Sequence, residues 1–268
     1  MTFMTHQKER HVNFSEAQTL SLSNLQIKSS NCVRFLGFLL DPHLNFKCHL
    51  DYVCSKLLKG IYALSRAAQV LPSSNELKLI YSALILPYLH YGLLSWGGKC
   101  KTKTPYYTLD SGDTSNNMIP LSRVHNLQKR ALRIVAKSNF LSHHIPLCYS
   151  LQLLDLEDIY NVKSLSFFYD YYHGELPPFY VNFLVLYVSR NNELLIKTNY
   201  RRTNLAASSL QNTLPNIWNP LPPSTKAYLT CSKPVFLRHI KQYYLEKYKY
   251  WTCIDDSCYV CRNASVCH

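Results

Sequence analysis

The sequence predicts a mainly α-helical fold, a helical bundle with a small β portion at the N-terminus and an irregular C-terminal region. Apolar residues recur at helical spacing in several segments between residues 43 and 250, whereas strict apolar–polar alternation is found near the N-terminus. Hydrophobic residues make up 47% of the 268 residues, which is enough to bury a core. Glycine occurs only 7 times, which excludes collagen-like and glycine-rich low-complexity classes.

Residues 1–42 are expected to supply the β portion. Residues 19–27 (TLSLSNLQI) alternate apolar and polar side chains, which is the period of a half-buried strand. Residues 32–40 (CVRFLGFLL) form a short apolar run with a glycine inside it, which is typical of a buried strand that bends. Asp41 and Pro42 are expected to end this strand.

Residues 43–175 are expected to form a helical domain that begins with two helices. Apolar residues follow i, i+3, i+4 spacing from Phe46 to Ala68, with Asn45 as the expected N-cap. Residues 73–76 (SSNE) have the pattern of a capping box that opens the second helix. This second helix is apolar nearly all round, so we expect it to be the most buried element, broken near Pro87.

The second helix also has to be tested as a membrane span. Residues 79–96 contain no Asp, Glu, Lys or Arg, and 18 residues are the lower limit for crossing a bilayer. Pro87, His90 and Gly92 are unfavourable in hydrocarbon. We therefore interpret the segment as a buried helix and expect no membrane partner.

The remainder of the helical domain is expected to contain a loop and two helices. Residues 98–120 are rich in Thr, Ser and Asn and lack an apolar period, which indicates a mobile loop. The third helix is expected from Leu121 to Lys137. The fourth is expected from Asp155 to His173, with Gly174 as its stop.

The end of the chain is expected to be mixed. Residues 176–250 combine short strands, loops and prolines, and finish in a closing helix that runs from about Ser232 to Tyr248. Residues 251–268 form a cysteine-rich tail, with candidate metal ligands at Cys253, Cys258, Cys261, Cys267 and His268. Such a set could close a tetrahedral Zn²⁺ site, and loose thiols are the alternative.

Charge points to a polyanionic partner. The formal net charge is +13, and aromatic residues make up 13% of the chain, a combination that suits nucleic acid, either a duplex or a single strand. The N-terminus lacks an apolar signal region, so we expect an intracellular protein, nuclear or cytoplasmic rather than secreted. The sequence has no glycine-rich phosphate loop, HExxH or GxSxG motif, and we expect no small-molecule substrate.

The third helix carries the candidate nucleic-acid-binding residues. At about 100° per residue, four cations fall within a sector of about 80°. They are Arg123, Arg130, Arg133 and Lys137, and Lys129 adds further charge. No acidic residue lies between positions 121 and 137. A stripe of this kind suits a phosphate backbone, and an ordinary solvated helix face is the alternative.

Several short motifs occur in a fixed order along residues 30–250. They are Val33–Gly37 with Asp41, Leu44–Phe46 and His49–Leu50; Leu84–Gly92 with Trp96–Gly97; Leu127–Ile134; Leu176–Pro178; Trp218–Pro222; and Phe236. Together they resemble the end of the reverse transcriptase of jockey-like non-LTR (LINE-type) retrotransposons, an RNA-directed DNA polymerase family.

This resemblance implies that residues 1–42 are the end of a palm, residues 43–175 a helical thumb and residues 176–250 a C-terminal region. The family's palm binds catalytic Mg²⁺ through an aromatic-x-Asp-Asp motif, which has no counterpart before residue 30. We therefore expect a truncated fragment that is not an enzyme by itself, with Mg²⁺ belonging to the intact parent polymerase. Its expected function is to bind the primer–template backbone without sequence specificity. The alternative is a helical protein-interaction module whose basic charge is incidental.

Overall fold

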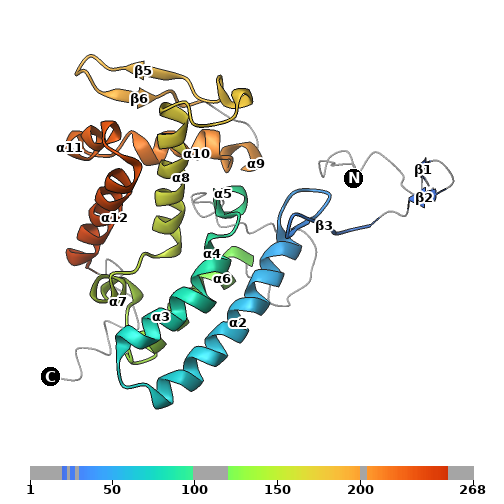
Figure 1. The fold of residues 1–268 in the computed structure, drawn as a ribbon, viewed down its shortest axis with the longest axis vertical. Coiled ribbons are helices and arrows are strands. Elements are labelled where there is room, and N and C mark those ends of the chain that lie inside the picture. Colours follow the sequence, from blue (N-terminus) through green and yellow to red (C-terminus); the bar gives the residue numbers. More distant parts are fainter. Residues whose placement is uncertain (1–19, 23–24, 28–29, 99–119, 200–203, 253–268) are drawn as a thin grey trace.

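In the part of the chain that the structure describes, the fold is mainly α-helical with three small β-hairpins (Figure 1). This computed structural model describes residues 20–22, 25–27, 30–98, 120–199 and 204–252. The helices within these ranges are α2 (Lys47–Val70), α3 (Ser74–Leu84), α4 (Leu86–His90), α5 (Leu93–Trp96), α6 (Pro120–Val135), α7 (His144–Leu151), α8 (Leu156–Tyr172), α9 (Asn204–Ala207), α10 (Leu210–Trp218), α11 (Pro223–Lys226) and α12 (Lys233–Lys249). Short 3-10 turns, η2 (Pro178–Tyr180) and η3 (Ala227–Thr230), connect some of them. The predicted fold class is confirmed.

The strands within the described ranges form three separate antiparallel pairs: β1 (Leu20–Leu22) with β2 (Leu25–Ile27), β3 (Val33–Phe35) with β4 (Phe38–Leu40), and β5 (Leu186–Val188) with β6 (Leu194–Ile196). The second pair corrects the prediction of one buried, bent strand at residues 32–40. The chain reverses at Leu36 and Gly37, whose φ angles are 46° and 85°, as a tight hairpin turn requires. Phe35 and Leu36 are 59% and 76% exposed, because too few neighbouring elements pack on this two-stranded ribbon to bury both of its faces.

The helices α2 and α6 pack side by side and run in the same direction. Arg123 near the start of α6 contacts Asp51 in the first turns of α2, and Lys137 just beyond α6 contacts Leu71 just beyond α2. Leu57 and Leu64 of α2 are fully buried, as are Val124 and Leu132 of α6. The helix pair therefore forms the framework of this part of the core.

Helix α8 forms the framework of the C-terminal part, where it packs against α5, α10 and α12. Phe168 of α8 contacts Trp218 of α10, and Tyr169 contacts Phe236 of α12. Buried side chains before and after residue 175 belong to one hydrophobic cluster. The division into a thumb-like domain at 43–175 and a mixed region at 176–250 stays a prediction.

The start of α2 differs from the prediction. Asn45 is not the N-cap; that position belongs to Phe46, whose φ of 57° is left-handed and which supplies no side-chain cap. The carboxylate of Asp41 takes the place of the missing side-chain cap. It accepts hydrogen bonds from the backbone N–H groups of His43, Asn45 and Lys47 at 3.1, 2.8 and 3.2 Å. Asp41 is only 8% exposed, so the residue expected to end a strand organises the entry to the helix.

The second predicted helix is divided into three. Ser73 is confirmed as an N-cap, since its Oγ accepts from the Asn75 amide at 3.2 Å. The helical path breaks after Leu84 and again at Gly92. The prediction that this is the most buried element is wrong, because Leu79 is 72% exposed. Neighbouring helices cover one face of α3 only. Within the described residues, every helix is too short or too polar to cross a membrane.

Other boundaries agree closely with the predictions. Asp155 is the N-cap of α8, His173 is its C-cap, and Gly174 follows with a φ of 70°. Ser232 is the N-cap of α12. Helix α6 ends at Val135, two residues earlier than expected, so Lys137 lies beyond it. The predicted loop, apart from its end residues, and the tail from residue 253 lie outside the described residues.

Candidate functional site

Helix α6 presents one narrow solvent-facing strip. One side of the helix is buried against α2, α3 and α7. The opposite side exposes Arg123, Asn126 and Arg130, which lie close to one another because residues three and four apart share a helix face. The exposed strip of α6 is therefore basic, and it carries no acidic residue of its own.

The two ends of the predicted cationic stripe are anchored to α2. Arg123 donates to Asp51 at 2.8 Å, and the two side chains are 48% and 46% exposed. Lys137 donates from Nζ to the Leu71 carbonyl oxygen at 2.7 Å. That carbonyl lies at the C-terminal end of α2, where the helix dipole favours a cation. Arg123 and Lys137 thus hold the two helices in register as well as adding positive charge.

The middle of the stripe consists of Arg130, which is unpaired among the described residues, and Arg133, which is engaged. Arg130 is exposed and forms no hydrogen bond or ion pair with any described residue. Arg133 is half-buried, donates from Nε to the Ser142 carbonyl at 2.8 Å, and lies over the Phe140 ring at 5.9 Å. Burial lowers the pKa of Arg133. Its position orders the turn after α6, and four of its five N–H donors remain for other partners.

Lys129 lies on the flank of α6 that faces α8. Burial lowers the pKa of Lys129, and the negative charge of Asp155 opposes that shift. The structure therefore leaves Arg123 and Arg130 on the exposed strip of α6. Arg133 turns toward the segment after the helix, Lys137 lies beyond its end, and Lys129 turns toward a separate group of side chains.

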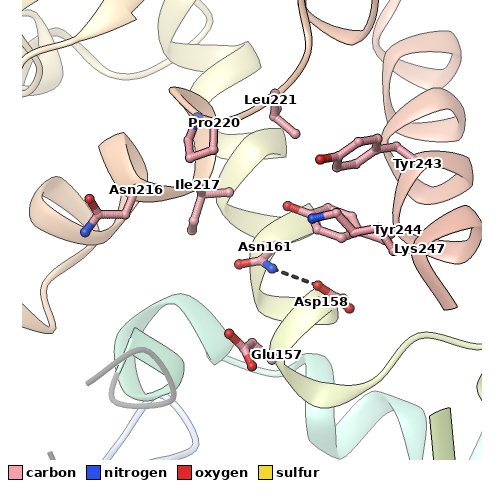
Figure 2. Close-up of a pocket in the computed structure, with 10 residues that line it drawn as sticks. All are labelled: Glu157, Asp158, Asn161, Asn216, Ile217, Pro220, Leu221, Tyr243, Tyr244 and Lys247. Atoms are coloured by element: carbon pink, nitrogen blue, oxygen red, sulfur yellow. Dashed lines mark hydrogen bonds between the residues drawn. The ribbon is translucent and has the colours of Figure 1, made fainter. Parts of the chain in front are cut away.

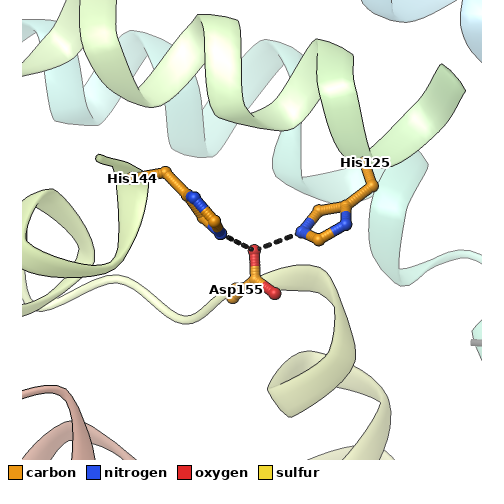
Figure 3. Close-up of side chains that lie close together, drawn as sticks. All are labelled: His125, His144 and Asp155. Carbon is orange, nitrogen blue, oxygen red and sulfur yellow. Dashed lines mark hydrogen bonds and ion pairs between the residues drawn. The ribbon is translucent and has the colours of Figure 1, made fainter. Parts of the chain in front are cut away.

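That group consists of His125, His144 and Asp155, hereafter the His–His–Asp cluster (Figure 3). His125 comes from α6, His144 is the first residue of α7, and Asp155 is the N-cap of α8. Their Nε2 and carboxylate oxygen atoms lie within 4.8 Å of one another. Both imidazoles approach the same oxygen, Asp155 Oδ1, at 2.7 Å from His125 and 3.5 Å from His144. These three side chains could hold a metal ion.

Electrostatics in the cluster favour an ionised carboxylate. Burial acts to raise the pKa of Asp155, but the hydrogen bond with His125 and the charges of His125, His144 and Lys129 outweigh burial and lower it. Burial also lowers the pKa of His144 to about 4, against the attraction of Asp155. At neutral pH the site therefore combines a carboxylate with a neutral His144 imidazole, which has a free lone pair.

The amino-acid sequence alone does not indicate the cluster. Its three residues are separated by 19 and 11 positions, with no motif that links them, and the helix that carries His144 was not predicted. The only local indication was the position of His125 one turn before Lys129 on the predicted basic helix.

A hollow in the surface lies where the start of α8 faces α10 and α12 (Figure 2). It measures about 240 Å³, and its polar lining includes Glu157, Asp158 and Lys247. Burial raises the pKa of Asp158, while hydrogen bonds from Tyr248 and Asn161 oppose that shift. Two carboxyl groups in its wall make this hollow a poor fit for phosphate.

The predicted zinc ligands Cys253, Cys258, Cys261, Cys267 and His268 lie outside the described residues. The aromatic residues before them are partly structural, because Tyr244 and Tyr248 of α12 are buried in the core. Comparison with protein families, with curated protein sequences and with solved structures gives no significant match to this chain.

Proposed function

We propose that this chain binds the sugar–phosphate backbone of nucleic acid through the exposed strip of α6, as a non-catalytic fragment of a retrotransposon reverse transcriptase. The observation that carries the proposal is Arg130, which is exposed and forms no contact with a charged or hydrogen-bonding partner among the described residues. It lies between Arg123 and Lys137 on a helix without acidic residues, in a chain with a net charge of +13. The ordered motifs that resemble the non-LTR polymerase family give the same expectation.

The internal contacts of Arg123 and Lys137 are compatible with this role. An ion pair between exposed side chains contributes only about 0–1 kcal/mol to stability, so Arg123 can exchange Asp51 for a phosphate at little cost. Lys137 has two further N–H donors after its bond to Leu71. Arginine is suited to such an exchange because its planar guanidinium can bind phosphate with two parallel hydrogen bonds.

Contacts of this kind position a protein on a duplex without recognising base sequence. We therefore expect binding that varies little with sequence and decreases steeply with salt. Each phosphate that the protein neutralises contributes a slope of about −0.9 in log K against log salt concentration on B-form DNA.

The test compares two charge-matched double variants on a labelled primer–template duplex over a series of salt concentrations. Arg123→Gln/Arg130→Gln removes two cations from the exposed strip and retains good helix formers. Arg238→Gln/Lys249→Gln removes two exposed cations from α12 and lowers the net charge equally. Circular dichroism and thermal unfolding establish that both variants are folded.

We expect the α6 variant to flatten the salt slope by about two units, whereas the α12 variant keeps the wild-type slope within about half a unit. Equal effects of the two variants would show that binding reflects net charge rather than the α6 strip. An unchanged slope in the α6 variant would remove the proposal.

An alternative function, a protein-interaction module, is favoured by a different observation. The β3–β4 hairpin exposes Val33, Phe35 and Leu36 at 38%, 59% and 76%. Exposed apolar groups of this kind mark interaction sites when they are contiguous. If this hairpin is the binding surface, the chain should bind a protein with an affinity that changes little with salt. Phe35→Ser should then weaken the binding of that protein, and the α6 double variant should not.

The cysteine-rich tail supplies a separate proposal for Zn²⁺, which rests on the spacing of its thiols. Zinc binding by thiolates releases protons, so the metal should be lost at low pH. Elemental analysis of protein purified under reducing, chelator-free conditions tests this, and replacement of the four tail cysteines by serine should abolish the metal content that depends on the tail.

A further inference from the structure

The His–His–Asp cluster combines ligand atoms from three different helical elements at one point. His125 of α6, His144 of α7 and Asp155 before α8 approach one another with their ring nitrogens and a carboxylate oxygen, as Figure 3 shows. Their ligand atoms lie within 4.8 Å of one another, close enough for a single ion to contact all three after small side-chain adjustments.

Hydrogen bonding explains the cluster only in part. The contact between His125 and Asp155, at 2.7 Å, has the length of a strong hydrogen bond. The contact between His144 and the same oxygen, at 3.5 Å, is too long for one. The two imidazole rings meet edge to face, with centroids 5.5 Å apart and an angle of 85° between the ring planes, so a ring contact also contributes to their approach.

Asp155 is also unusual for its position in the fold. It is the N-cap residue of α8, where an aspartate ordinarily accepts a hydrogen bond from the backbone of the first helical turn. Its side chain makes no such bond, and Oδ1 is directed at the two imidazoles instead. The residue is only 6% exposed, so its orientation is determined by the surrounding protein.

We propose that His125, His144 and Asp155 form a Zn²⁺ site that keeps a coordination position open to solvent. Two imidazoles and one carboxylate are a ligand set that Zn²⁺ accepts, whereas Mg²⁺ and Ca²⁺ prefer oxygen ligands throughout. With metal–ligand bonds of about 2.1 Å, tetrahedral ligands lie about 3.4 Å apart. The separation of 3.5 Å between His144 Nε2 and Asp155 Oδ1 already fits this value. The separation of 2.7 Å between His125 Nε2 and Asp155 Oδ1 must widen by about 0.7 Å.

The environment of the cluster explains both the open position and its expected occupant. The His125 and His144 side chains are 31% and 18% exposed, so solvent reaches one side of the site. Lys129 and Arg133 interact electrostatically with its residues. Their positive charge weakens metal binding but favours an anion, such as phosphate, at the open position.

The test uses the full chain with Cys253, Cys258, Cys261 and Cys267 replaced by serine, so that the tail cannot contribute. Co²⁺ replaces Zn²⁺ as a spectroscopic probe, and Zn²⁺ competition measures affinity. We compare this parent with His125→Gln and His144→Gln, and with His239→Gln as a matched control. His239 lies on α12 and stacks on Tyr228, away from the cluster.

We expect one equivalent of Co²⁺ with visible d–d bands, no thiolate-to-cobalt charge-transfer band, and an increase in Tm on addition of Zn²⁺. His125→Gln and His144→Gln should each weaken Zn²⁺ binding by about tenfold or more, and His239→Gln should not change it.

Three results would overturn the proposal. One is the absence of metal binding by the folded parent. Another is equal affinity in the cluster variants and in His239→Gln. The third is a thiolate charge-transfer band, which would assign the metal to a cysteine such as Cys148. Because the measurements contain no nucleic acid, their outcome is independent of the function proposed for α6.

Discussion

The side chain of Asn219 hydrogen-bonds to both backbone groups of Ile196. Its Oδ1 accepts from the Ile196 N–H at 2.9 Å, and its Nδ2 donates to the Ile196 carbonyl oxygen at 2.9 Å. Ile196 ends β6, so one carboxamide takes the place of a neighbouring strand. The adjacent Trp218 donates from its indole to the Leu194 carbonyl at 2.9 Å. Together the two side chains fasten the β5–β6 hairpin to the end of α10.

We predict that Asn219→Leu destabilises the protein by about 2 kcal/mol, because it leaves a buried backbone donor and acceptor without partners. Urea unfolding followed by circular dichroism measures the change. The matched control is Asn216→Leu, an exposed position on α10, which should stay within about 0.5 kcal/mol of wild type. Equal effects at both positions would mean that the hairpin does not depend on Asn219.

The two aspartates near the start of α2 should differ in their effects. Asp41→Ala removes the acceptor for three backbone N–H groups and should cost about 2 kcal/mol. Asp51→Ala breaks only an exposed ion pair with Arg123 and should cost less than about 1 kcal/mol. The same unfolding measurement on both variants is the check, and a larger loss at Asp51 would contradict it.

His49 is a buried histidine whose two ring nitrogens have no hydrogen-bond partner among the described residues. Its ring lies 5.0 Å from that of Phe38 and 6.4 Å from that of Tyr52. We predict that His49→Phe is neutral or stabilising by about 1 kcal/mol, because it removes an unsatisfied polar group and keeps the ring contacts. His239→Phe, at a half-buried position, serves as the control and should not increase the free energy of unfolding.

The pH dependence of this variant gives an independent check. Burial lowers the pKa of His49, so below the ordinary value of about 6.5 the unfolded chain binds a proton that the folded chain does not. Wild-type stability is therefore lost as the pH decreases from neutral. His90 adds to this loss in both proteins, since burial lowers its pKa to about 4. The difference in free energy of unfolding between His49→Phe and wild type should increase as the pH is lowered from 7 to 5. A difference that is constant with pH would refute this explanation.

The purified chain should not extend a primer on an RNA template. The resemblance to the non-LTR polymerases places the Mg²⁺-binding carboxylates in a part of the palm that has no counterpart in this sequence. Incorporation of labelled nucleotides is the measurement, with an intact reverse transcriptase as the positive control. The tail contains two adjacent aspartates, Asp255 and Asp256. Metal-dependent incorporation that Asp256→Ala abolishes would show that this pair acts as a catalytic site.

The sequence by itself determined the fold class and most of the long helices. The amphipathic period and the local caps identify α6, α8 and α12 to within about two residues, because both depend on neighbours a few positions apart. The position of Arg130 on an exposed strip also followed from helical periodicity.

Only the tertiary structure decided how these elements use their side chains. Asp41 rather than Asn45 organises the start of α2, and Leu79 is exposed although its helix is apolar nearly all round. His125, His144 and Asp155 meet although no spacing links them. Periodicity reports which side of a helix is apolar, but which face is covered and which distant polar groups meet depend on the packing of several helices. Those contacts between residues far apart in the chain leave no local pattern in the sequence.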